Sequence, residues 1–348
     1  MKTRKLLVAT AATIAAVSIC AMFSQPASAQ SYAGPGPAPV FTDNFQTGND
    51  TVNTATGPGG TPTASYTSYN MNYDKGTGFT DTISPGDLNK NFPSSSSMFG
   101  EAQAVFSSSP VTLSAVGDYI DFILEFTDTA NILGSSGGVA NELNMGLYDD
   151  GGIEPLPGNV ATMTAQTGGT QGWTGYYSQI LNANGGTSSK LWYRPSQISN
   201  TGSGTETLAV NTGTISGGFG NTGTPSYQAV QLINASKAST VIMTNGVQYT
   251  EDFRITLASP GVLSVSNEVF TGLGTGGVLD YQFGGYTNAT DMSFDGLAFL
   301  VGNKNTVVMT QDVSEIEITT NIPEPSTWML IAASLPVLLA VVSRRRRS

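Results

Sequence analysis

Carboxylates are the side chains of this chain that could catalyse acid–base reactions or bind a metal ion. The 348 residues contain no histidine, and the single cysteine, Cys20, lies in an apolar segment near the N-terminus. Catalysis by Ser-His-Asp or Cys-His groups, histidine zinc sites and histidine pH switches are therefore excluded. The 25 Asp and Glu residues leave two chemistries: hydrolysis by a carboxylate pair, and oxygen ligation of Ca²⁺.

A carboxylate pair for glycoside hydrolysis is not evident along the sequence. Asp121 and Glu125 share one face of a predicted strand, but four residues of strand separate them by about 13 Å. Retaining glycosidases need about 5.5 Å and inverting ones about 6.5–9.5 Å. We therefore predict no catalytic residue, and we keep as an alternative a hydrolase or lyase whose carboxylates only the fold brings together.

Three segments carry oxygen ligands that suit Ca²⁺. Residues 87–91 (Asp-Leu-Asn-Lys-Asn) have the spacing at the start of a calcium loop, although Phe92 stands where such a loop has glycine. Residues 148–152 form a predicted turn with two carboxylates, and Asp291 and Asp295 flank another short segment. Each set could equally be turn or surface residues, so we predict no cofactor and no metal residue, and we leave Ca²⁺ open.

Aromatic residues gather at two places that could contact a sugar. Trp173 and Tyr177 form one group and Trp192 belongs to the second. Aromatic rings stack on the apolar faces of sugars, although rings in a β protein also fill the core. We predict Trp173, Tyr177 and Trp192 as the candidate sugar-binding residues, with a core position as the alternative.

Charge is distributed unevenly along the chain. The segment between the two ends carries 24 carboxylates and seven Lys or Arg residues, a net charge near −17. No basic patch is available to neutralise phosphates, so nucleic acid is excluded as a partner.

The N-terminus has the plan of a secretory signal peptide. A basic start (Lys2, Arg4, Lys5) precedes an apolar run, and Ala27 and Ala29 supply the small residues of a cleavage site. We predict residues 1–29 as the signal peptide and Gln30 as the first mature residue; an uncleaved anchor is the alternative.

The C-terminus combines three features in a fixed order. Pro323, Glu324 and Pro325 precede an apolar segment, which ends in the tail anchor made by Arg344, Arg345, Arg346 and Arg347. An 18-residue span that begins at Thr327 reaches about 27 Å as a helix, enough for a thin bilayer, and the arginines would hold their end in the cytoplasm. The prolines favour an extended segment that a protease could accept.

This tail resembles the PEP-CTERM sorting signal of Gram-negative bacteria. The resemblance implies Pro323, Glu324 and Pro325 as the recognition motif of an exosortase-type processing enzyme, and it implies an organism that makes exopolysaccharide. A plain C-terminal anchor is the alternative. We expect export to the periplasm, outer surface or extracellular matrix, with a transient anchor in the inner membrane.

The body predicts an all-β fold, a two-sheet sandwich or jelly roll, between the signal helix and the C-terminal transmembrane helix. Residues 118–126 and 248–258 alternate apolar and polar side chains with the period of a strand, and 262–270 follow 248–258 through a tight turn. Further strands are predicted at 278–283, 292–301, 306–310 and 315–319. We predict a Pro/Gly linker at 30–41, the sandwich at 42–320 and the sorting signal at 321–348.

Two stretches of the body, 144–149 and 292–299, resemble PEP-CTERM ectodomains of the Verrucomicrobia/Planctomycetes type. The second also resembles strands of concanavalin A-like lectin and glucanase sandwiches, which implies sugar binding. The leading hypothesis is a non-catalytic envelope or matrix protein with exopolysaccharide as a partner. A secreted carbohydrate-active enzyme and a purely structural matrix protein are the alternatives.

Overall fold

The computed structural model describes most of the predicted sandwich. The described residues are 39–45, 66–72, 80–92, 98–107, 109–133, 141–151, 170–182, 189–196, 208–209, 230–234, 243–303 and 308–322. All of them belong to one compact unit, residues 37–348. The predicted signal peptide, the sorting motif at Pro323–Pro325 and the arginine tail lie outside the described residues. Within the described ranges, no helix is long and apolar enough to span a bilayer.

One sheet has eight antiparallel strands. Its order is β14-β13-β12-β7-β17-β4-β3, and β1 also pairs with β17. The bounds are β1 Pro39–Asp43, β3 Thr80–Ser84, β4 Asp87–Phe92, β7 Tyr119–Ala130, β12 Val247–Ser259, β13 Val262–Thr271, β14 Val278–Asn288 and β17 Met309–Thr320.

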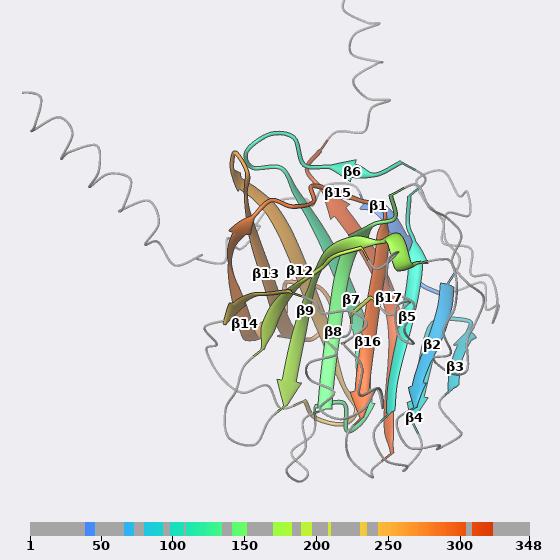
Figure 1. Cartoon of the computed structure of the whole chain (residues 1–348). Coiled ribbons are helices and arrows are strands. Elements are labelled where there is room, and N and C mark those ends of the chain that lie inside the picture. Colours follow the sequence, from blue (N-terminus) through green and yellow to red (C-terminus); the bar gives the residue numbers. More distant parts are fainter. Residues whose placement is uncertain are drawn as a thin grey trace, which may run out of the picture. The chain divides into compact units, whose positions relative to one another are not determined.

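The second sheet has seven antiparallel strands in the order β11-β10-β9-β8-β16-β5-β2, most of which lie side by side in Figure 1. The bounds are β2 Tyr66–Asn72, β5 Met98–Val105, β8 Asn141–Asp149, β9 Thr174–Asn182, β10 Lys190–Arg194, β11 Val230–Asn234 and β16 Gly296–Asn303. A short pair, β6 Val111–Thr112 with β15 Ser293–Phe294, and the 3₁₀ turn η1 Thr170–Gly172 complete the described elements.

The two sheets pack face to face around one apolar core. On β7, Ile120, Phe122 and alternate residues onward point inward and are buried, as the period of two requires. The ring of Phe122 meets that of Phe299, on β16 of the other sheet, edge to face at 6.4 Å between centroids. This contact between sheets confirms the predicted all-β sandwich.

The strand predictions are confirmed best where alternation is regular. Strands β7, β12 and β13 occupy the intervals predicted from the pattern, and β12 and β13 form the predicted hairpin, with Gly261 at a φ of 74° in its turn. A left-handed residue in a tight turn is normally glycine because other residues meet their own Cβ there.

Two local predictions are wrong. The interval 292–301 is two strands, because the backbone breaks at Asp295 between β15 and β16. The intervals 306–310 and 315–319 are not two strands, since one strand, β17, runs from Met309 to Thr320. The calcium loop that was left open at residues 87–91 does not form, because these residues belong to strand β4, where Lys90 is buried. Strand β1 also begins at Pro39, inside the interval expected as a linker.

Candidate functional site

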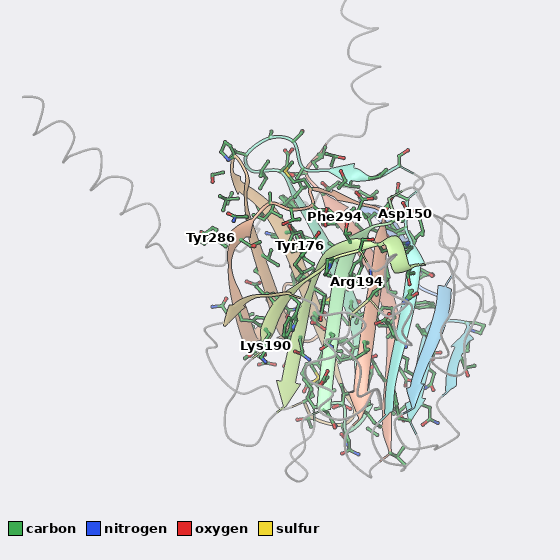
Figure 2. All side chains as sticks on the ribbon, in the orientation of Figure 1. Asp150, Tyr176, Lys190, Arg194, Tyr286 and Phe294 are labelled. Atoms are coloured by element: carbon green, nitrogen blue, oxygen red, sulfur yellow. The ribbon has the colours of Figure 1, made fainter. Side chains whose placement is uncertain are left out.

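The outer face of the seven-stranded sheet is lined with polar side chains. Residues that pair directly across antiparallel strands share a face, and the registers of β5, β16, β8, β9 and β10 place these residues opposite the core side. We call this surface the polar face; it comprises Glu101, Gln103, Glu142, Asn144, Gln179, Lys190, Trp192 and Arg194. Lys190 and Arg194 are labelled along it in Figure 2.

The three predicted sugar-binding residues all lie on this outer side of the sheet. Tyr177 and Trp192 are paired across β9 and β10, and their rings stack at 6.3 Å with an interplanar angle of 18°. The ring of Trp173 packs directly on Gly296. All three are enclosed, with exposed fractions of 0% for Trp173 and Tyr177 and 4% for Trp192. Their neighbour Tyr176 points the other way, into the core.

Hydrogen bonds link the polar face from strand to strand. The indole Nε1 of Trp192 donates to Oε1 of Gln179 at 3.0 Å, and Nε2 of Gln179 donates to Oε2 of Glu142 at 3.0 Å. The Nζ of Lys190 lies 5.4 Å from the centre of the Trp192 ring. Aromatic and amide groups of this kind also bind sugars, so the face has the right chemistry. Trp192, Gln179 and Glu142 bond one another here, whereas Oδ1 of Asn144 and Nε1 of Trp173 have no hydrogen-bond partner among the described residues.

A short segment, Leu208–Ala209, covers part of the polar face. The backbone N–H groups of Leu208 and Ala209 donate to Oε1 and Oε2 of Glu101 at 2.9 and 2.8 Å. Nδ2 of Asn144 donates to the carbonyl of Ala209 at 2.8 Å, and both covering residues are buried. Burial raises the pKa of Glu101, and hydrogen bonds from Gln103 and the two N–H groups oppose that rise. Glu101 is thus an anchor for the segment.

Three carboxylates meet where β8 ends and β16 begins. Asp149 and Asp150 come from the first segment and Asp295 from the second, and one carboxylate oxygen from each lies within 4.8 Å of the others. The backbone N–H of Asp150 donates to Oδ1 of Asp295 at 2.8 Å, and the N–H of Asp295 donates to the carbonyl of Tyr148 at 2.9 Å. We call these three residues the aspartate cluster. Figure 2 places Asp150 and Phe294 at the same end of the sandwich.

The aspartate cluster concentrates negative charge. Burial first, and then a side-chain hydrogen bond and charge repulsion from Asp150 and Asp149, raise the pKa of Asp295 to about 7. Burial also raises the pKa of Asp291, and the nearby charge of Asp149 adds to that rise. One further bond, from Gly151 N–H to Oδ1 of Asp149 at 2.8 Å, fixes the turn.

The aspartate cluster adjoins the polar face. Asp149 pairs with Thr174, the residue after Trp173, and Gly296 under the Trp173 ring follows Asp295. Arg194 donates to the carbonyl of Trp173. A cation held by the cluster would therefore lie at the edge of the aromatic and amide groups.

The donor set of the cluster fits Ca²⁺. This ion takes six to eight oxygen ligands at about 2.3–2.6 Å and binds Asp carboxylates readily. The three carboxylates lie close enough to repel one another, as the raised pKa of Asp295 indicates. A bound cation would neutralise their charge. The sequence had indicated 148–152 and 291–295 separately. Their convergence could not be predicted, because it depends on β8 and β16 being neighbours in the sheet.

No protein-family model and no curated protein matches this chain. Several solved structures have a similar course of the chain. The exoplasmic/lumenal domain of VIP36, in a Ca²⁺/Man₂-bound form, is 10% identical with a TM-score of 0.39, over 82% of this chain and 92% of that one. Lectin II from Ulex europaeus is 11% identical with a TM-score of 0.36, over 82% of this chain and 100% of the lectin chain. Peanut lectin with a 9mer peptide is 10% identical with a TM-score of 0.34, over 74% of this chain and 97% of the lectin chain.

Proposed function

We propose that this protein is an exported, non-catalytic envelope or matrix protein that binds polysaccharide at the aspartate cluster and the adjoining polar face. The observation that carries the proposal is the convergence of Asp149, Asp150 and Asp295 beside Trp173. A Ca²⁺ ion held there would supply open coordination positions for sugar hydroxyls. Amide and aromatic side chains next to it would give further hydrogen bonds and stacking.

Trp173, Tyr177 and Trp192 would form the floor of the sugar site. The three rings are enclosed, and Leu208–Ala209 lies over Glu101 and Asn144 of the same face, so contact of a sugar with the rings requires the groups that cover them to move. The exposed Gly151 and the half-buried Asp149 mark the accessible start of the site.

A binding assay with and without chelator tests the proposal. Immobilised exopolysaccharides and a glycan array are probed with the protein in CaCl₂ and again in EDTA. We expect binding in CaCl₂, loss of binding in EDTA, and loss in Asp295→Asn. The matched control is Asp280→Asn, which removes the same charge from an exposed position on β14. Binding that stays at the wild-type CaCl₂ level both in EDTA and in Asp295→Asn would refute the role of the cluster.

A glycoside hydrolase is the second candidate, and one observation favours it. A carboxyl with a pKa near 7 beside another carboxylate is the arrangement of a general acid and its partner. However, the side chains of Asp150 and Asp295 are hydrogen-bonded to each other, whereas a retaining pair stands about 5–5.5 Å apart with the substrate between. Release of reducing ends that persists in EDTA and disappears in Asp295→Asn would support the enzyme.

Export and sorting are part of the same proposal and are supported by the sequence alone. Cleavage after Ala29 would leave Gln30 as the first residue, and an exosortase would act at Pro323–Pro325 while the arginine tail holds the chain in the inner membrane. Mass spectrometry of both ends of the protein from the producing cell tests this. A product that retains Met1 and Ser348 would refute it.

A further inference from the structure

The outer face of the eight-stranded sheet, away from the aspartate cluster, carries a second group of carboxylates. They occupy three successive rows of paired residues on β13, β12, β7 and β17. We call this surface the acidic face; its carboxylates are Asp121, Glu125, Asp252, Glu268, Glu315 and Glu317. Among the described residues of that face, Arg254 is the only basic side chain.

Arg254 is already committed to one of these carboxylates. Its Nε and Nη2 donate to Oδ1 and Oδ2 of Asp121 at 2.5 and 2.6 Å, and its guanidinium lies 4.7 Å from the centre of the Tyr119 ring. A two-bond pair of this kind satisfies the guanidinium and fixes its direction. The carboxylates of the neighbouring row therefore receive only part of its charge.

That neighbouring row places three oxygen donors side by side. Asp252 on β12 pairs with Glu268 on β13, and Glu268 pairs with Gln282 on β14. Directly paired residues on one face have Cβ atoms about 4.5–5.5 Å apart. Two carboxylates and an amide thus stand in one row on the same face of three adjacent strands.

Asp252 is the unusual member of the row. Its side chain is 7% exposed, and Oδ1 has no hydrogen-bond partner within the part of the chain that the structure describes. Burial, and then the charge of Asp121, raise its pKa well above the ordinary value; Arg254 opposes this, and Glu268 and Glu251 add to it. An unsatisfied buried carboxylate costs stability unless an ion or water completes it.

We propose that Asp252, Glu268 and Gln282 bind a divalent cation, with Ca²⁺ the ion that their oxygens fit. Ca²⁺ accepts both Asp/Glu carboxylates and Gln carbonyls, whereas zinc prefers nitrogen and sulfur ligands. Two carboxylates completed by water suit the weak class of extracellular site, with dissociation constants of about 10⁻⁴–10⁻³ M. This site is separate from the aspartate cluster and does not depend on sugar binding.

Calorimetric titration of the full-length protein with CaCl₂ tests the site. We expect Asp252→Asn and Glu268→Gln each to abolish one binding event or weaken it at least ~10-fold. Asp280→Asn, which removes a charge from an exposed position on β14 that is not one of the proposed ligands, should bind as the wild type does. Asp295→Asn should remove a different event, so failure of this site and failure of the aspartate cluster are distinguishable.

Thermal melting separates loss of a ligand from loss of the fold. In EDTA, Asp252→Asn removes repulsion and should melt at or above the wild-type temperature, while the rise in Tm caused by CaCl₂ should shrink. If a variant fails to fold, Gln282→Ala gives the same comparison from a half-buried position. Wild-type affinity and stoichiometry in both Asp252→Asn and Glu268→Gln would overturn the proposal.

Discussion

Inside the sandwich, Nδ2 of Asn267 donates to Oε1 of Glu251 at 2.6 Å. The same amide donates to Oγ of Ser178, on the opposite sheet, at 2.7 Å. Glu251 and Asn267 are fully buried, and in the described part of the chain Oε2 of Glu251 has no partner. Burial raises the pKa of Glu251 from 4.5 to about 8, and the bond from Asn267 opposes the rise.

The first prediction concerns the effect of Glu251 on stability. The folded protein keeps the proton up to about pH 8, while the unfolded chain loses it near pH 4.5. The contribution of this group is therefore fully present below pH 4.5 and is lost as pH rises toward 8, by on the order of a few kcal/mol. Glu251→Gln should flatten the fall in Tm between pH 5 and pH 9, measured by thermal denaturation. An unchanged slope would contradict the assignment.

The second prediction concerns Gly146, on β8. A Cβ at this position would lie 2.5 Å from Cβ of Tyr177 and 2.7 Å from the carbonyl oxygen of Tyr176, which is fixed in the sheet. Gly146→Ala should lower the free energy of unfolding by about 1–3 kcal/mol through overpacking. Gly276→Ala is the control, because nothing lies within 4 Å of its added Cβ. Urea denaturation of both variants makes the comparison.

The third prediction concerns the segment that Glu101 holds. Glu101→Gln removes the charge of the carboxylate that accepts hydrogen bonds from two backbone N–H groups. Hydrogen bonds to charged groups contribute about 1.5–3 kcal/mol each. Hydrogen exchange at the amides of Leu208 and Ala209 should accelerate at least ~10-fold. If the segment covers a sugar site, the variant should also bind polysaccharide more tightly. Glu315→Gln, on the other sheet, should change neither result.

The fourth prediction concerns the pair of Arg254 with Asp121. Lysine keeps the charge but cannot make two parallel bonds to one carboxylate or stack its plane on Tyr119. Arg254→Lys should therefore destabilise the protein by about 1 kcal/mol. The expected loss is this small because the Arg254 side chain is partly exposed and water screens its charge. A double-mutant cycle with Asp121→Asn measures the coupling, and additive effects would contradict it.

Regular alternation made most of the eight-stranded sheet predictable. The pattern of β7, β12 and β13 follows directly from one buried and one outer face. In β17 the register shifts between Thr310 and Gln311 and again between Val313 and Glu315. A bulge adds a residue and reverses the alternation, which is why one strand was predicted as two.

Polar residues at inward positions were the part that the sequence could not reveal. Glu251, Asn267 and Lys90 alternate in register with core residues, but their type favours an outer face. They are accommodated by contacts between strands distant in sequence, such as the Nζ of Lys90 at 5.1 Å from the centre of the Phe299 ring. The aspartate cluster could not be predicted either, because it also depends on contact between strands distant in sequence, β8 and β16.

The order of strands has a consequence for synthesis. The last strand, β17, lies between β7 and β4 and also pairs with β1, while β16 lies between β8 and β5. Neighbouring strands such as β3 and β4, or β8 and β9, can pair early, but neither sheet is complete until β16 and β17, near the end of the described chain, have been synthesised. Assembly must then be slow and dominated by long-range pairing. The chain therefore stays incompletely folded, and able to pass through a narrow channel as an extended polypeptide, until β17 has been synthesised.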